Sequence, residues 1–303
     1  MSLNNSLPLI AIVCLLSACG EITKQESNTD QNDAVQLGKQ ALTAQAYARF
    51  VPEREDDFAW ENDRVAFRVY GPASPAKGPA SGVDAWFKSV DYPIIDKWYA
   101  EHLSGQSYHE DQGEGYDVYH TGTSRGVGGT AIWVDGKPYP AGQFSSWKLL
   151  DTDSSEVSFE LTYEWTTPLG EITENKVITL PLGSNLYKVE SQFLLNGEVS
   201  SIPVAIGLTT HDEKASTYGD ASKAYISTWE RIDDIGVGTG VVLKTDLAKE
   251  LKHEASEVKD ESHVWLITST NEQGKLEFFA GFAWAKRGNI TTLEDWQQYL
   301  ATY

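Results

Sequence analysis

Apolar residues recur at every second position over several stretches of the chain, and no other feature of the sequence restricts the fold as strongly. Val65, Phe67 and Val69 follow this pattern, and it returns over 157–163 and 187–193. Side chains of a β-strand point alternately to its two faces, so each stretch predicts a strand with one buried face. Further strands are predicted at 131–134, 147–150, 176–180, 202–208, 224–229, 241–244, 264–268 and 277–284, with turn sequences such as Asp135-Gly136 and Asn196-Gly197 between them.

Few crossover helices are predicted between these strands, which favours a mainly β protein built as a large antiparallel β-sandwich. One short helix is predicted to begin at Pro93, because proline suits the first helical position. A second is predicted after the capping sequence at 291–294, with Leu293, Trp296 and Leu300 on one face.

The N-terminal sequence predicts export and a lipid anchor. Residues 7–18 are apolar but too few to span a bilayer, and small residues before Cys19 resemble a bacterial lipoprotein box. We therefore expect a signal peptide at 1–18, a lipidated Cys19 carrying acyl chains such as palmitate, a flexible tether to residue 40, and a single β-sandwich catalytic domain at 41–303. An ordinary signal peptide is the alternative. The protein is expected in the cell envelope, at the outer membrane facing the periplasm, touching the membrane only through its anchor.

The charge balance excludes one class of partner. The formal net charge is -20, whereas a nucleic-acid-binding surface gathers Lys and Arg against phosphate. Residues 245–262 are the most highly charged stretch near the C-terminus and are expected to form a helical or loop insert without a chemical role.

The densest group of chemically active side chains lies at 108–129. Residues 108–125 contain two His, four carboxylates, three Tyr and one Arg within eighteen positions, with glycines between them. Buried charge without a partner is very costly, so this segment is expected to be a site loop on a rigid scaffold. A solvated, glycine-rich surface loop is the alternative.

Three chemistries fit this loop. His109 with Glu110, Asp111 or Glu114 would suit a divalent metal, although the spacing matches no strong zinc pattern, so no cofactor is assigned with certainty. Histidine and tyrosine can act as base and acid, and arginine can clamp a carboxylate or sulfate through two hydrogen bonds. The corresponding candidates are His109, Tyr116, His120 and Arg125. Together these groups are typical of a site for elimination on an anionic sugar.

Neighbouring segments supply further candidates. Trp86 is a candidate platform for a sugar ring, with core packing as the alternative, and Lys88 would contact the anion of that sugar. Asp91, Lys97 and Glu114 complete the predicted substrate-binding set. His211 follows an apolar strand and precedes Asp212 and Glu213, which makes it a candidate catalytic residue or, alternatively, a capped surface histidine. An anionic ligand would require Lys88, Lys97 and Arg125 to converge on the site.

Several stretches resemble a family of secreted bacterial proteins long classed as of unknown function. The similar stretches are 61–72, 90–99, 108–129 and 280–284, and the resemblance covers about residues 45–300. The resemblance implies a β-sandwich of the galactose-mutarotase type, encoded among genes for polysaccharide degradation. One branch of that family is an oligosaccharide dehydratase in the breakdown of ulvan, a sulfated algal polymer.

These observations lead to one preferred hypothesis about activity. The protein is expected to be a carbon–oxygen lyase that removes water from an anionic or unsaturated oligosaccharide. His109 is assigned as the base, Tyr116 or His120 as the acid, Arg125 as the anion clamp and His211 as a supporting residue. The alternatives are a mutarotase or epimerase on the same fold, a non-catalytic glycan-binding surface lipoprotein, and a chain-cleaving polysaccharide lyase. The oligomeric state is left open.

Overall fold

The computed structural model describes residues 43–303 apart from residues 77, 151 and 245–249. The described residues belong to one compact unit, Gln40–Tyr303. The predicted signal peptide, Cys19 and the tether therefore lie outside the described residues. Within the described part of the chain, no helix is long and apolar enough to cross a membrane.

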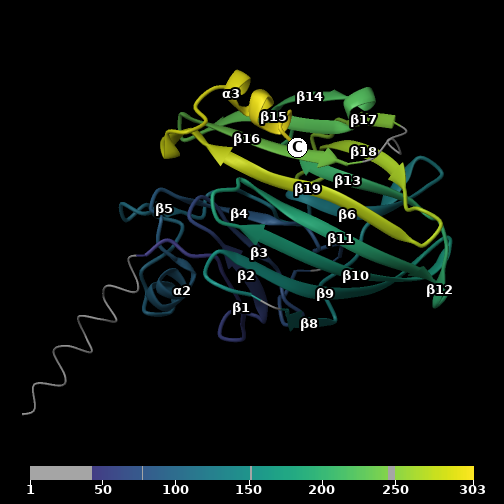
Figure 1. The fold of residues 1–303 in the computed structure, drawn as a ribbon, viewed down its shortest axis with the longest axis horizontal. Helices are drawn as coiled ribbons and strands as arrows, with labels where there is room; N and C mark the ends of the chain where they lie inside the picture. The colour runs from purple at the N-terminus through teal and green to yellow at the C-terminus, as the bar shows by residue number, and fades with distance from the viewer. Residues whose placement is uncertain (1–42, 77, 151, 245–249) are drawn as a thin grey trace, which may run out of the picture. The chain divides into compact units, whose positions relative to one another are not determined.

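The described residues form three sheets, and the strand pairings among them are antiparallel (Figure 1). The first sheet has the order β1 (Tyr47–Val51), β2 (Asp57–Glu61), β3 (Ala66–Val69), β4 (Asp84–Lys88) and β5 (Gly115–Tyr116). The largest runs from β14 (Ser216–Asp220) through β15 (Tyr225–Ile232), β16 (Ile235–Leu243), β19 (Lys275–Trp284), β11 (Leu186–Leu195), β10 (Gly170–Pro181) and β9 (Glu156–Thr167) to β8 (Ser146–Leu149), with β12 (Glu198–Val199) on β11. The third has the order β17 (Glu250–Glu254), β18 (His263–Ser269), β13 (Pro203–Thr209), β6 (Val127–Val134) and β7 (Lys137–Tyr139).

One hydrophobic core joins the three sheets. Phe67 from the first sheet, Phe159 and Phe278 from the largest, and Ile206 from the third belong to the same buried cluster. Along β9 and β10 the buried and partly exposed residues alternate as the sequence predicts, so one face of the large sheet covers this core. The expected mainly β, antiparallel sandwich is confirmed.

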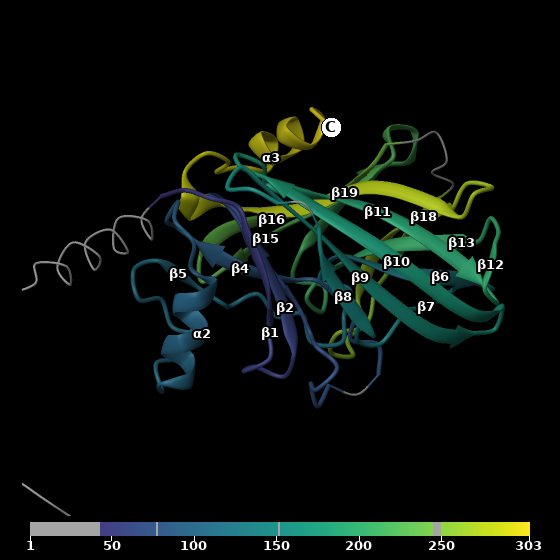
Figure 2. The same cartoon turned by 60° about the horizontal axis from the view of Figure 1, so that its bottom comes forward.

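Helix α2 (Ile95–Leu103) begins two residues after Pro93, so the predicted helix is present. The carboxylate of Glu61, on β2, accepts the N–H groups of Ile94 and Ile95 at 2.8 and 2.9 Å and holds the start of the helix. The helix lies beside the first sheet (Figure 2). A buried carboxylate at a helix start satisfies backbone donors that would otherwise lack partners.

Helix α3 (Leu293–Leu300) buries Trp296 and Leu300 against β16, as the predicted apolar face requires. One detail of the prediction is wrong. The Thr292 hydroxyl accepts the N–H of Asp295, and the Asp295 carboxylate accepts the N–H of Thr292, so the capping partner is Asp295 rather than Glu294.

The predicted insert at 245–262 also needs correction. Residues 250–254 form strand β17, which pairs with β18, and residues 245–249 lie outside the described residues. Because β17 is the edge strand of its sheet, one side meets no neighbouring strand, and charged residues are tolerated there.

Candidate functional site

Two histidines that are distant in the sequence line one cleft of about 400 Å³. His120 comes from the dense loop after β5, and His211 follows the end of β13. Glu230 on β15 and Asp260, between β17 and β18, line the same cleft. Further lining residues are Val118, Asp212, Lys214, Arg231, Ile232 and Lys259. We call this the histidine cleft.

Buried polar contacts hold the loop that carries His120. The Asp117 carboxylate accepts from the Arg68 guanidinium at 3.1 Å, and the Thr121 hydroxyl donates to Asp84 at 2.9 Å. Arg68 also donates to Asp84 at 2.6 Å, so both anchors of the loop meet at one buried cation. The sequence predicts that so polar a segment needs extensive pairing, and these contacts supply it.

His120 forms a dyad with Asp260. The Nε2 atom of His120 lies 2.8 Å from Oδ1 of Asp260. An ionised carboxylate only accepts hydrogen bonds, so Nε2 carries a proton and the neutral ring keeps its lone pair on Nδ1. The side chain of His120 is 50% exposed, and no described residue is hydrogen-bonded to Nδ1. This nitrogen can therefore take a proton from a molecule bound in the cleft.

The backbone around the dyad is shaped for close approach. A Cβ at Gly122 would lie 2.1 Å from Oδ2 of Asp260 and 2.9 Å from Nε2 of His120, so a side chain there would separate the two groups. Gly122 also has a φ of 53°, which favours glycine. The N–H of Thr123 donates to Oδ2 of Asp260 at 3.2 Å and helps to orient the carboxylate.

His211 makes contacts through both ring nitrogens. Its Nε2 lies 2.9 Å from the backbone oxygen of His120, and a carbonyl only accepts, so Nε2 carries a proton. Its Nδ1 lies 2.6 Å from Oε1 of Glu230. That contact requires one more proton, either on the imidazole or on the carboxyl group. The His211–Glu230 pair therefore shares a proton at the wall of the cleft.

The turn that presents His211 has an uncommon backbone. His211, Asp212 and Glu213 have φ values of 49°, 56° and 66°, which are left-handed and cost roughly 1 kcal/mol per residue. Glu213 accepts hydrogen bonds from Thr210 and His253 at 3.0 Å each, and Asp212 accepts the N–H of Asp260 at 3.2 Å. These contacts hold the strained turn and tie it to the loop that carries Asp260. Strain of this kind is common at functional sites.

Tyr116 is close to His120 in the sequence, but its hydroxyl group forms a hydrogen bond to a residue outside the lining of the cleft. Its hydroxyl donates to the Asp233 carboxylate, at the tip of the β15–β16 hairpin, at 2.7 Å. Burial and the hydrogen bond to Asp233 raise the pKa of the Tyr116 hydroxyl. A phenol with a raised pKa that already donates to a carboxylate is a poor acid, so we do not retain Tyr116 in that role.

The structure places His109 outside the histidine cleft. Its Nδ1 lies 2.7 Å from the backbone oxygen of Asp117, and its ring packs against Tyr108 with 4.6 Å between ring centroids. The side chain is 56% exposed, but it does not line the cleft that contains His120 and His211. We therefore move the assignment of the base from His109 to His120.

Arg125 requires a clear correction. Its side chain is buried, and the guanidinium donates to the Ser81 hydroxyl at 2.9 Å and to the Pro79 and Thr123 carbonyls at 2.6 and 3.0 Å. Burial lowers the pKa of Arg125 to about 10. No surface of this group is left for a substrate anion, so its assignment as a clamp is withdrawn. The local sequence does not reveal that Gly207, on β13, packs against this side chain.

Two predicted substrate-binding residues are also core residues. Trp86 is 0% exposed and stacks on Trp98 with ring centroids 5.6 Å apart, so the core alternative holds. Lys88 is buried and donates to Glu61 at 2.5 Å. Neither side chain reaches a ligand surface, and both assignments are withdrawn.

The remaining predicted residues form surface ion pairs. Lys97 donates to Glu114 at 2.7 Å, and Asp91 pairs with Arg287. Burial works against the charged form of Glu114, but hydrogen bonds from Lys97, Tyr92 and Trp98 outweigh it and lower the pKa of Glu114. Lys88, Lys97 and Arg125 each have separate partners, so the predicted convergence of these three cations does not occur.

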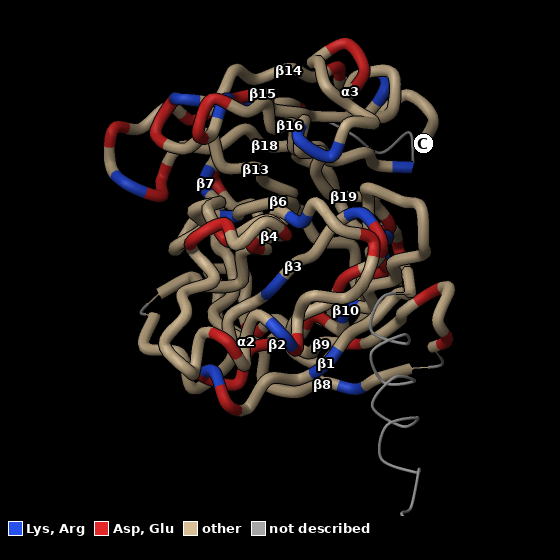
Figure 3. The backbone as a smooth tube through the Cα atoms, turned by 90° about the vertical axis from the view of Figure 1, so that its left-hand side faces the viewer, with Lys and Arg blue, Asp and Glu red and all other residues tan. Residues whose placement is uncertain are grey.

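Cations do gather at the candidate site, but they are not the three that the sequence predicts. Lys214, Arg231 and Lys259 line the histidine cleft, and the loops beside β14 and β15 carry both acidic and basic positions (Figure 3). Sequence reasoning missed these cations, together with Glu230 and Asp260. In the sequence, the local signal for such residues was a charged residue next to a histidine. Asp260 lies in a segment that was predicted to be an insert without a chemical role.

No group of three or more His, Cys, Asp or Glu side chains that could hold a metal ion is found within the described residues. The metal ligands predicted from sequence are His109 with Glu110, Asp111 or Glu114. Two of these carboxylates form ion pairs instead: Asp111 pairs with Lys286, and Glu114 pairs with Lys97.

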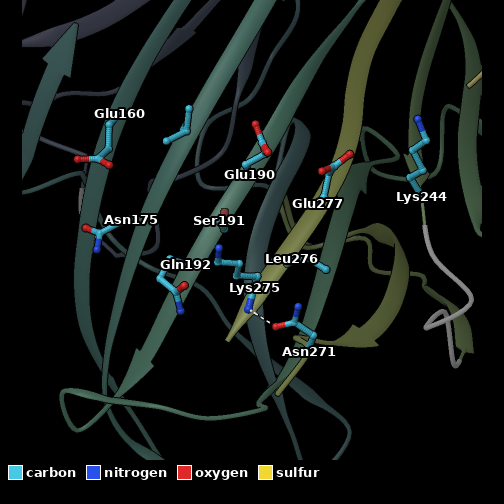
Figure 4. A pocket seen from close by; sticks show the side chains of 11 residues that line it. Glu160, Asn175, Glu190, Ser191, Gln192, Lys244, Asn271, Lys275, Leu276 and Glu277 are labelled. Carbon is cyan, nitrogen blue, oxygen red and sulfur yellow. Dashed lines mark hydrogen bonds between the residues drawn. The ribbon is translucent and has the colours of Figure 1, made fainter. Parts of the chain in front are cut away.

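A separate groove of about 460 Å³ crosses the outer face of the large sheet (Figure 4). Glu160, Glu190, Glu277 and Lys275 project into it from β9, β11 and β19. Among its described lining residues there is no histidine, and Lys188 links Glu190 and Glu277 at 3.1 and 3.2 Å. We do not place the reaction there.

Comparisons with known proteins match this chain to a family. A family model described as "Domain of unknown function (DUF4861)" matches residues 16–303. An uncharacterized protein, P7, of Formosa agariphila is 36% identical over 272 residues, which are 86% of this chain and 67% of that protein.

Solved structures show only a distant likeness. A Klebsiella pneumoniae protein described as an aldose 1-epimerase is 9% identical, with 84% of this chain and 87% of that chain covered and a TM-score of 0.39. A Lactobacillus brevis alpha-galactosidase is 9% identical, with 82% of this chain and 42% of that chain covered and a TM-score of 0.38. A Thermococcus litoralis 4-alpha-glucanotransferase is 10% identical, with 81% of this chain and 40% of that chain covered and a TM-score of 0.36. The chain spans about two fifths of the length of the last two, and each of the three is named for a reaction on a sugar.

Proposed function

Because this chain belongs to the family described as a domain of unknown function (DUF4861), whose description assigns no activity, we propose an activity from the site itself. The protein is a carbon–oxygen lyase that removes water from an anionic or unsaturated oligosaccharide. The observation that carries this proposal is the His120–Asp260 dyad, which lines one cleft together with the hydrogen-bonded pair of His211 and Glu230.

The proposed reaction divides its proton transfers between the two pairs. Nδ1 of His120 takes the proton α to a carboxylate or other activating group, and Asp260 stabilises the imidazolium that forms. The electron pair of the broken C–H bond becomes the new C=C bond, and the β C–O bond breaks. The shared proton of His211 and Glu230 goes to the departing oxygen, which leaves as water. Solvent then returns the proton from His120 to that pair.

Cations at the cleft support an anionic substrate. Lys214, Arg231 and Lys259 line it, and a cation beside a carboxylate stabilises the negative charge that develops when the α-proton leaves. The carboxylates of Glu230 and Asp260 are engaged by the two histidines. We propose sulfated uronic-acid oligosaccharides of the ulvan type, from marine polysaccharide degradation, as the substrate class to test first.

His120→Ala is expected to lower kcat by about a hundredfold or more, the usual contribution of a positioned general base. The assay follows the absorbance of the unsaturated product and the loss of one water by mass spectrometry. Asp260→Asn is expected to lower kcat by at least as much, because an amide can donate to Nε2 and so favours the tautomer that carries its proton on Nδ1, which cannot act as a base. His109→Ala serves as the control and is expected to retain activity. Full activity of His120→Ala would rule out this assignment.

A mutarotase or epimerase is the second candidate, because the cleft contains two histidine–carboxylate pairs and such a reaction needs a base and an acid near the anomeric carbon. Product mass distinguishes the two activities: dehydration removes one water, and mutarotation or epimerisation leaves the mass unchanged. A glycan-binding lipoprotein without activity would bind the same oligosaccharides and release no product.

The lipid anchor is a separate proposal, carried by the sequence around Cys19. Two or more acyl chains on one cysteine bind a membrane stably, whereas one chain gives only marginal binding. In a bacterial host, Cys19→Ser is expected to move the protein from the outer-membrane fraction to the soluble periplasmic fraction, measured by immunoblot after fractionation. An unchanged membrane share would count against lipidation at Cys19.

A further inference from the structure

A second, shallow and widely open cleft, of about 550 Å³, adjoins the histidine cleft. Arg231 lines both clefts. We infer that this second cleft is a subsite for an anionic sugar that adjoins the reacting sugar of an oligosaccharide. The inference rests on the proposed function only for the position of the reacting sugar.

Strand β15 explains how the two clefts come to be adjacent. Consecutive side chains of a strand point to opposite faces, and Trp229, Glu230 and Arg231 follow one another at its end. Glu230 lines the histidine cleft, and Trp229 lines the second cleft. Arg231 lies beside the tip of the β15–β16 hairpin, from which it reaches both. The two clefts thus lie on opposite sides of β15 and meet where Arg231 lines both.

The lining of the second cleft suits an anionic sugar. Arg231 and Lys286 supply two cations against one acidic lining residue, Asp234, and Trp229 supplies an aromatic surface. A Cβ at Gly236 would lie 2.6 Å from the Trp229 ring, so glycine is what lets this ring lie over the neighbouring strand. A cation for the acid group and a ring for the apolar face of the sugar are the two kinds of contact that such a ligand needs.

The charges in this cleft are not fully neutralised within the described residues. The Arg231 guanidinium donates to the backbone carbonyl of Asp234, and no ion pair links it to a carboxylate of a described residue. Lys286 donates to Asp111 at 2.5 Å and remains 40% exposed. The N–H groups of Thr291 and Thr292, just before α3, donate to Asp295, so these two groups are not available to an anion in this cleft.

The test compares oligosaccharide lengths by titration calorimetry. The probes are a sulfated uronic-acid disaccharide and the corresponding tetrasaccharide, and the protein is the His120→Ala variant. Because this variant should not turn the probes over, the result stands whether or not elimination is the activity. The tetrasaccharide is expected to bind about tenfold more tightly than the disaccharide, the effect of one additional charged contact. Lys286→Gln, added to that variant, is expected to remove this difference.

Asp111→Asn is the matched control, because it breaks the same ion pair and leaves the charge of Lys286 in place. It is expected to keep the tenfold preference for the tetrasaccharide. Equal affinity for the two probes before any change at Lys286, or a preference that survives Lys286→Gln, would overturn the subsite. Loss of the preference in Asp111→Asn as well would show that the loop, not the cation, is responsible, and would also overturn it.

Discussion

His263, on β18 of the third sheet, is a buried histidine with hydrogen bonds at both ring nitrogens. Its Nε2 accepts the N–H of Arg125 at 3.0 Å, and its Nδ1 donates to the carbonyl of Glu261 at 2.9 Å. These contacts require the neutral ring, because a protonated Nε2 could not accept. Burial, followed by the charge of Arg125, lowers the pKa of His263 to about 4 from 6.5.

This shift predicts acid sensitivity with a definite sign. The folded pKa lies below the unfolded one, so the stabilising effect is complete above pH 6.5 and is lost as the pH falls toward 4. The corresponding loss of unfolding free energy is about 3 kcal/mol. Urea unfolding at pH 7 and pH 4 is expected to show a smaller loss for His263→Gln than for the unchanged protein. The half-exposed His109→Gln should behave like the unchanged protein, and equal losses in all three would contradict this assignment.

At the scale of elements, the loop between β5 and β6 depends on glycines that permit close backbone approach. Gly126 has a φ of 54°, and a Cβ there would lie 2.0 Å from the backbone oxygen of Val83. The N–H of Val127 donates to that same oxygen at 2.9 Å, which joins the loop to the start of β4. The loop that carries His120 is thus held by backbone contacts as well as by buried ion pairs.

Gly126→Ala is expected to destabilise the protein by roughly 3 kcal/mol or more, because it combines a left-handed backbone with a backbone clash. Gly136→Ala is the matched control. Gly136 has a φ of 76° but has nothing within 4 Å of an added Cβ, so only the conformational cost of about 1 kcal/mol applies. The measurement is the difference in unfolding free energy from denaturant titration. Equal effects of the two substitutions would show that the close approach to Val83 does not matter.

Strand prediction succeeded where apolar residues alternate or run continuously, including the buried strands β13 and β18, and failed at β2, where charged residues lie within a buried strand. Strands β9, β10 and β11 alternate between buried and more exposed residues, and their sequences show it. Strand β2 is buried at all five positions, including Asp57 and Glu61, and gives no alternation. The charged strand β17 was predicted as an insert because an edge strand needs few apolar residues.

At the scale of the whole molecule, the negative charge belongs mostly to the folded part of the chain. Residues 1–42 contain four acidic and two basic residues, so the predicted tether accounts for little of the net charge of -20. An anionic ligand must therefore be attracted by local cations within about 10 Å, the distance over which salt leaves charges unscreened. The cations in position to do so are those of the histidine cleft and of the second cleft.

The amino-acid sequence predicts the class of fold and the loop that carries His120, because alternation, turn residues and dense polar segments are local features. The family followed from the resemblance of whole stretches. Which groups share a site depends on tertiary packing. Glu230 and Asp260 reach the histidines from strands and loops far away in the chain, and contacts of that kind leave no local pattern. Burial had the same effect on Arg125, Trp86 and Lys88, because a side chain becomes core or site according to what packs over it.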